Sequence, residues 1–183
     1  MVSVKYALLA FGLLGAAANA APAPEVDYVS ALIPGEGLPS PKELGMTNAD
    51  LTKPIPEDDL PLDGRHSLPA GISERDLSIL EKRTTCRFTD TCKLRDSTAC
   101  FNYLHRLNTR ACTVTRRPGQ FCRMGGCSWI GQAAGTNRAS SHCRDVARGG
   151  KKVNDRCRIF DRIGGFNFAH GNGHVRVTIA GRS

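Results

Sequence analysis

Residues 92–112 read CKLRDSTACFNYLHRLNTRAC, a stretch that combines helical periodicity with three cysteines. Asp96 is placed to cap a helix that we expect to run to about Asn108. Three residues fall at i, i+4 and i+7 on one face of this helix, namely Cys100, Leu104 and Leu107. The stretch therefore predicts a helix that packs through this face.

The sequence after this helix favours strands. Residues 111–115 and 121–130 are predicted as strand segments, separated by a turn at 116–119. Near the C-terminus, three apolar residues alternate with polar ones, as in a strand with one buried face: Val175, Val177 and Ile179.

A second helix is expected to begin at Ser140 or Ser141 and to run to about Ala147, where Gly149-Gly150 would end it. Two helices and four or five short strands in irregular order predict an α+β fold. The expected architecture is a small disulfide-rich α/β sandwich with a mainly antiparallel sheet.

The chain contains 8 cysteines, all of them after residue 83. They are Cys86, Cys92, Cys100, Cys112, Cys122, Cys127, Cys143 and Cys157. Their spacing lacks the close C-x2-C pairs of zinc sites, so we expect four disulfides and no metal. Each bridge adds about 2–4 kcal/mol to stability, and such bridges are typical of secreted domains. Sequence alone leaves the pairing open.

The N-terminal half carries two processing signals. Residues 1–20 have a positive charge at Lys5, an apolar run and a closing Ala18-Asn19-Ala20, as in a secretory signal peptide. Residues 21–83 hold 9 of the 10 prolines, 12 acidic residues and no cysteine, and they end at Lys82-Arg83. We interpret them as a pro-segment cut by a kexin-type protease, with little packing beyond a short helix near residues 73–80.

The expected mature domain, residues 84–183, is strongly cationic. It has 18 basic and 5 acidic residues, a net charge of +13, and no glutamate. Solubility requires a net charge of only about 2–8 in magnitude, so we expect a binding role for this charge. The candidate target-binding residues are Arg116, Arg117, Arg123, Arg144, Arg148, Lys151 and Lys152. A further basic group is Arg156, Arg158 and Arg162.

The turn at 116–119 is the preferred contact. Arg116 and Arg117 precede Pro118-Gly119, and a bridge between Cys112 and Cys122 is expected to fix the loop. Together with Arg123, the loop would present three guanidinium groups at one place, which lowers the entropy lost on binding an acidic partner.

Catalysis is not expected. Glycoside hydrolysis needs a carboxylate pair, but each aspartate of the mature domain lies near arginine, which lowers a carboxyl pKa. The stretch from His170 to His174 contains two glycines and is read as a loop, not a metal site. Secreted ribonuclease activity through histidine and arginine remains the alternative enzyme class, with four candidate histidines: His105, His142, His170 and His174.

The order of elements resembles a known family. The resemblance rests first on Cys86-x5-Cys92, a helix ending in Arg-Ala-Cys112, Phe121-Cys122 followed by a glycine pair, and Cys127-Ser-Trp-Ile. They continue with Cys143-Arg-Asp-Val, Asn154-Asp-Arg-Cys157-Arg and His170-Gly-Asn-Gly-His-Val-Arg-Val-Thr-Ile. Together they resemble the killer protein four-like family, which comprises a small secreted killer toxin encoded by a virus of smut fungi and its secreted fungal and moss relatives. The chain lacks the family's C-x2-C pair and closing cysteine.

The resemblance implies a sandwich of five antiparallel strands with two helices on one face. It also implies growth inhibition of other cells through calcium channels, or an effector role in virulence. We therefore expect a secreted, extracellular, monomeric effector without cofactor that binds a cell-surface protein or channel, or an anionic membrane or cell wall. Nucleic acid is a disfavoured partner, because aromatic residues for base stacking are few. A plain polyanion or cell-wall binder is a further alternative.

Overall fold

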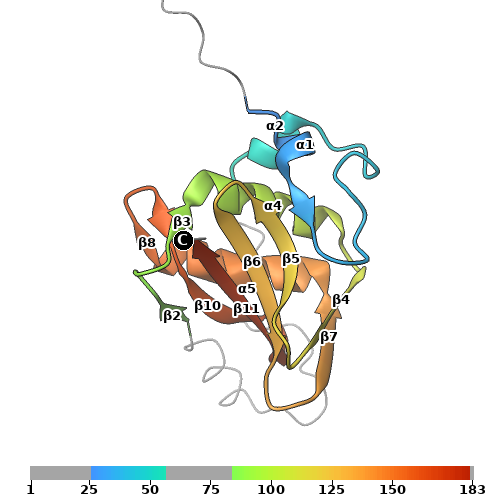
Figure 1. The fold of residues 1–183 in the computed structure, drawn as a ribbon, viewed down its shortest axis with the longest axis vertical. Coiled ribbons are helices and arrows are strands. Elements are labelled where there is room, and N and C mark those ends of the chain that lie inside the picture. Colours follow the sequence, from blue (N-terminus) through green and yellow to red (C-terminus); the bar gives the residue numbers. More distant parts are fainter. Residues whose placement is uncertain (1–25, 57–83, 182–183) are drawn as a thin grey trace, which may run out of the picture.

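The computed structural model describes residues 26–56 and 84–181 (Figure 1). Three predictions fall outside these ranges: the signal peptide of residues 1–20, the helix near residues 73–80 and the processing site at Lys82-Arg83. The fold is α+β, and every strand pairing among the described residues is antiparallel. The predicted class, with its mainly antiparallel sheet and four disulfides, is confirmed.

The main sheet has six strands in the order β1-β5-β6-β11-β10-β2. Its four longer strands are β5 (Gly119–Met124), β6 (Cys127–Ala133), β10 (Gly165–Ala169) and β11 (Asn172–Gly181). Short edge strands complete it, β1 (Ile33–Pro34) on one side and β2 (Thr85–Cys86) on the other.

Two smaller sheets accompany it. Strand β4 (Ala111–Thr115) pairs with β7 (Arg138–His142), and the third sheet has the order β3-β9-β8. The bounds of these last strands are Cys92–Lys93 for β3, Arg158–Ile159 for β8 and Arg162–Ile163 for β9.

The described helices are α1 (Tyr28–Ala31), α2 (Asn48–Thr52), α4 (Leu94–Arg106) and α5 (Cys143–Arg156). None of them is long and apolar enough to cross a membrane.

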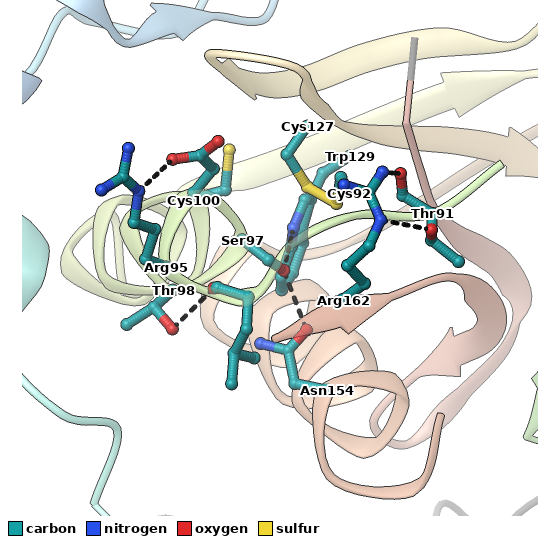
Figure 2. The surroundings of a disulfide bond; sticks show 12 residues. Thr91, Cys92, Arg95, Ser97, Thr98, Cys100, Cys127, Trp129, Asn154 and Arg162 are labelled. Carbon is teal, nitrogen blue, oxygen red and sulfur yellow. Dashed lines mark hydrogen bonds and ion pairs between the residues drawn. A yellow bond between two sulfur atoms is a disulfide. The ribbon is translucent and has the colours of Figure 1, made fainter. Parts of the chain in front are cut away.

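Trp129 of β6 lies at the centre of the core and is fully buried. Its indole Nε1 donates a hydrogen bond of 2.9 Å to Ser97 Oγ of α4, and Ser97 Oγ donates at 2.8 Å to Asn154 Oδ1 of α5 (Figure 2). A buried chain of polar groups therefore links the sheet to both long helices. On β11, the predicted inward residues Val175, Val177 and Ile179 are all buried, which confirms that strand.

The second helix differs from the prediction at both ends. Helix α5 begins at Cys143 after His142 and continues through Gly149-Gly150 to Arg156. A Cβ on Gly149 would lie 2.4 Å from the carbonyl oxygen of Phe168, and one on Gly150 would lie 2.1 Å from the Trp129 ring. The two glycines therefore permit close packing of the helix on its neighbours and do not end it.

Two further local predictions are corrected. Asp96 does not cap α4, because Lys93 is the N-cap residue and Asp96 lies buried in the first turn. Residues 121–130 form a hairpin and not one strand, since Gly125, with a φ of 52°, makes the turn between β5 and β6. Strand β4 matches the predicted residues 111–115.

All 8 cysteines are paired. The pairs are Cys86–Cys157, Cys92–Cys127, Cys100–Cys122 and Cys112–Cys143. The expected bridge between Cys112 and Cys122 is wrong. Strand β4 pairs with β7 and not with β5, which brings Cys112 to the start of α5, while Cys122 faces Cys100 of α4.

Residues 26–56 are packed, contrary to the prediction of little structure before the mature domain. They lie against α4 and the edge of β5 (Figure 1). Four of their side chains belong to the hydrophobic core: Tyr28, Leu32, Met46 and Leu51. The high proline content of this region did not prevent packing, because its described prolines lie outside the helices, in a turn, in irregular segments or in a short edge strand.

Candidate binding surface

The loop that carries Arg116 and Arg117 is fixed through its backbone. Arg116 N donates to the carbonyl oxygen of Asn137 at 3.2 Å, and Gln132 Nε2 donates to the Arg116 carbonyl at 2.8 Å. The Thr115 hydroxyl donates to the Arg117 carbonyl at 3.3 Å. Both arginines are exposed. The loop therefore presents two guanidinium groups to solvent from a positioned backbone.

Arg123 does not join this loop. It lies near the other end of β5, opposite Ile33 of β1, and is half-buried. At about 3.4 Å per residue, four residues from Gly119 place its Cα about 14 Å along the strand. The expected group of three guanidinium groups is therefore wrong, and the loop offers a pair.

Arg144 and Arg148 gather around one carboxylate at the start of α5. Asp145 Oδ1 lies 3.4 Å from Arg148 Nη1 and 4.0 Å from Arg144 Nε, while Asp145 Oδ2 lies 3.5 Å from His142 Nδ1. Arg144 Nη1 also donates to Asn108 Oδ1 at 3.1 Å. These contacts place the two arginines together. Part of their positive charge is neutralised by Asp145, so less of it is available to a partner.

Lys151 was predicted to bind the target, but its side chain is buried. Its Nζ donates to Asp155 Oδ2 at 2.8 Å, one turn along α5. A buried, paired ammonium is not displayed to a partner. Lys152 is half-buried on the same helix.

In the basic group of Arg156, Arg158 and Arg162, the Arg162 side chain stabilises the fold. Its guanidinium donates to the Thr91 hydroxyl at 2.8 Å and also to the Thr91 carbonyl, beside the Cys92–Cys127 bridge (Figure 2). Arg158 Nε donates to the Phe160 carbonyl at 2.5 Å. Arg156 and Arg158 are exposed.

The four histidines do not form one site. His105 stacks on Phe101 with ring centroids 5.4 Å apart, and His174 Nδ1 lies 3.1 Å from the Ala134 carbonyl. His142 contacts Asp145, whose carbonyl accepts the backbone N–H of His170 at 2.9 Å. Within the described ranges, no three His, Cys, Asp or Glu side chains come together as metal ligands.

The surface beneath residues 26–56 is the feature that sequence reasoning missed. Asn102 Nδ2 donates to the carbonyls of Leu51 and Lys53, each at 2.9 Å, and the Tyr103 hydroxyl donates to the Pro39 carbonyl at 2.7 Å. Asn102 lies on the side of α4 away from Cys100, whereas Tyr103, three residues after Cys100, lies at the edge of the Cys100 face. The burial of Asn102 therefore requires a cover on that side of the helix.

Two signals could have revealed this cover. Phe101 and Tyr103 add large aromatic side chains to a helix that already has an apolar face, and a helix apolar on several sides is buried on several sides. Thr47-Asn48-Ala49-Asp50 also has the spacing of a capping box, which the structure contains: Asp50 N donates to Thr47 Oγ1 at 3.2 Å and Thr47 N to Asp50 Oδ2 at 2.9 Å.

A groove of about 490 Å³ runs between residues 34–38 and strands β4 and β5. Glu36 lines it from residues 26–56, and Arg117 and Gln120 line it from residues 84–181. The preferred basic loop therefore borders the face that residues 26–56 cover.

Fold and surface define a small cationic α+β domain cross-linked by four disulfides. The model of a domain of unknown function, DUF8794, matches residues 81–181. This match covers more than half of the chain, so the chain belongs to that family. No curated protein and no solved structure matches this chain.

Proposed function

We propose that this chain is a secreted effector, similar to a killer toxin, that binds an acidic target at the surface of another cell. It is exported by residues 1–20 and cut after Arg83 by a processing protease of the secretory pathway. The product, residues 84–183, acts as a monomer without cofactor or catalysis. Its target is a cell-surface protein such as a channel, and its effect is growth inhibition.

The observation that carries this proposal is the loop of Arg116 and Arg117. The backbone of Arg116 and Arg117 takes part in three hydrogen bonds, whereas both side chains are exposed. Guanidinium groups bind carboxylates through paired hydrogen bonds. On a domain with a net charge of +13, such a loop suits an acidic protein surface.

The sandwich arrangement belongs to the same proposal. Its support is Trp129, whose indole donates to Ser97 of α4 and whose ring lies against Gly150 of α5. Contact of both helices with one residue of β6 favours a common face for the two helices, as in the family that the sequence resembles.

The test applies secreted, processed protein to fungal and plant cells and measures binding and growth, with added calcium and salt as variables. We expect saturable binding that weakens as salt rises, because exposed charges are screened beyond about 8 Å at 0.15 M. Mass spectrometry should show a chain that begins at Thr84. Absence of binding by the separated residues 84–183 to every cell type, or a secreted chain that begins near Ala21 without a shorter product, would contradict the proposal.

Incubation with total RNA separates this proposal from the ribonuclease alternative. We expect no cleavage, because the four candidate histidines do not form one site: His105 stacks on Phe101, and His174 lies against the Ala134 carbonyl. His142 and His170 both contact Asp145, His170 through its backbone N–H. RNA degradation that disappears in His170→Ala or His174→Ala would establish the enzyme instead.

A further inference from the structure

Residues 26–56 extend the sheet of the mature domain by one strand. Ile33 and Pro34 of β1 lie opposite Arg123 and Cys122 of β5, and Gly35 N donates to the Phe121 carbonyl at 2.9 Å. A Cβ on Gly35 would lie 2.1 Å from the Gln120 carbonyl oxygen, so the two backbones are in close contact. An added strand of this kind is a common way for an extended peptide to bind a sheet edge.

The same segment covers α4 with apolar side chains. Leu51 of α2 has no exposed surface, and Leu32 and Met46 are 4% and 7% exposed. Helix α2 packs on α4, where Asn102 Nδ2 donates to the carbonyls of Leu51 within α2 and of Lys53 just after it. Burial raises the pKa of the Tyr103 hydroxyl, which donates to Pro39. The covered face is thus largely apolar, and its two polar side chains, Asn102 and Tyr103, donate hydrogen bonds to backbone carbonyls of the segment.

Charge is complementary across this contact. The pKa of Glu43 is lowered chiefly by the Ser40 backbone N–H and then its hydroxyl, and the Arg110 charge adds to the effect. The pKa of Asp50 is lowered by the Thr47 N–H and hydroxyl, with Lys53 and Arg106 contributing. Two carboxylates of the segment therefore lie in the field of two arginines, Arg106 at the end of α4 and Arg110 directly before β4.

No disulfide joins the segment to the rest of the chain, because it contains no cysteine. After cleavage at Lys82-Arg83, it would be held only by the strand pairing, hydrogen bonds and apolar contacts above. Glu36 and Arg117 line one groove, so a partner that reaches the loop of Arg116 and Arg117 would meet the segment.

We propose that the face formed by α4 and the edge of β5 is the surface through which the mature domain binds its target. Residues 26–56 occupy this face as an inhibitory partner that stays bound, without a covalent link, after cleavage. The inference rests on the proposed function for the cleavage and for the existence of a target. The target that fits is a protein segment that adds a strand to β5, inserts apolar side chains beside α4 and presents carboxylates to Arg106 and Arg110.

The experiment starts from the complete secreted chain, cut at Lys82-Arg83 with a protease specific for dibasic sites. Size-exclusion chromatography and native mass spectrometry then establish whether the two pieces remain together. We expect a one-to-one complex. Hydrogen exchange should show protected amides in β5 before and after the cut.

Leu51→Asp and Ala49→Asp form a matched pair of variants. Both add one negative charge to α2, but Leu51 is fully buried and Ala49 is exposed. After the cut, Leu51→Asp should release the segment, and Ala49→Asp should retain it. Neither variant changes the sequence of the mature domain. The released domain should bind cells at least tenfold more tightly than the complex.

Each contrary result has a distinct meaning. Separation of the wild-type pieces on cutting overturns the inference, and so does equal cell binding by complex and released domain. Loss of the near-ultraviolet circular dichroism of the released domain also overturns it, because the segment would then be part of the fold. A folded released domain that binds no cell overturns the proposed function, and the inhibitory role with it.

Discussion

The ring of Trp129 lies where a side chain on Gly150 would be. A Cβ at position 150 would come within 2.1 Å of Trp129 Cζ3 and 2.2 Å of Cη2. The contact joins the middle of α5 to the middle of β6, and it explains why a helix can retain a glycine that costs about 1 kcal/mol in helix propensity.

Gly150→Ala should therefore destabilise the domain, although alanine is the better helix former. Overpacking of this kind costs about 1–3 kcal/mol, because the rigid indole and the helix must move apart. Urea unfolding of the oxidised protein measures the change. Gly126→Ala is the control, since a Cβ there meets nothing within 4 Å, and an equal loss in both variants would contradict this explanation.

Ser97→Ala should cost about 1–3 kcal/mol, because it leaves the buried Trp129 Nε1 and Asn154 Oδ1 without their shared partner. Thermal or urea unfolding reports the loss. Ser128→Ala, on the same strand as Trp129 and half-buried, should change stability by less than about 0.5 kcal/mol. A Ser97→Ala protein as stable as wild type would show that the polar chain contributes little.

Asp96→Asn should stabilise the domain more at pH 7 than at pH 3. Burial raises the pKa of Asp96 above its ordinary value of 3.8, against the opposing charges of Arg95 and Lys93. Wild type therefore has this group's full contribution to stability below pH 3.8 and loses it as the pH rises through the folded-state pKa. Asparagine does not ionise, so the variant escapes that loss.

Urea midpoints of wild type and Asp96→Asn, compared at each pH, test this prediction. The difference at one pH removes the titration of all other groups. A difference that stays constant from pH 3 to pH 7, or one that favours wild type more at pH 7, contradicts a raised pKa.

Arg116→Glu combined with Arg117→Glu should leave folding and oxidation intact, because both side chains are exposed. Binding to cells should fall by tenfold or more, since the double change reverses the charge of the loop. Arg87→Glu with Arg158→Glu is the control, because it makes the same change in net charge at two exposed residues that lie in neither the loop nor α4. Equal binding by the two double variants would move the contact away from the loop, and Arg144 and Arg148 would become the next candidates.

Sequence patterns predicted the parts of the fold that depend on local order. Alternation identified the buried residues of β11, and the cysteine count identified four disulfides. Prediction failed where a distant partner decides the outcome. Gly149-Gly150 has the sequence of a helix end, but Phe168 and Trp129 make it a packing site.

Prediction of the binding residues also succeeded where local sequence decides the outcome and failed where distant contacts do. Exposure of Arg116 and Arg117 follows from a turn that contains Pro118-Gly119, which is local information. The burial of Lys151 depends on a partner one turn away and on the packing of α5, and Arg123 is separated from the loop by the length of a strand. The cover over α4 was missed because proline and acidic residues were read as signs of disorder, although Leu32 and Leu51 supply apolar contacts.

Strand β11 has a consequence for the order in which the molecule is built. It lies between β6 and β10, and it is the last described element of the chain. All the cysteines precede both β10 and β11. During synthesis, the bridges can therefore close before the strand that fills the middle of the sheet has emerged. Until residues 172–181 are synthesised, β6 and β10 have no strand to pair with on the edges that face each other. A chain oxidised at that stage would have all four disulfides but would lack the strand that joins the two halves of its main sheet.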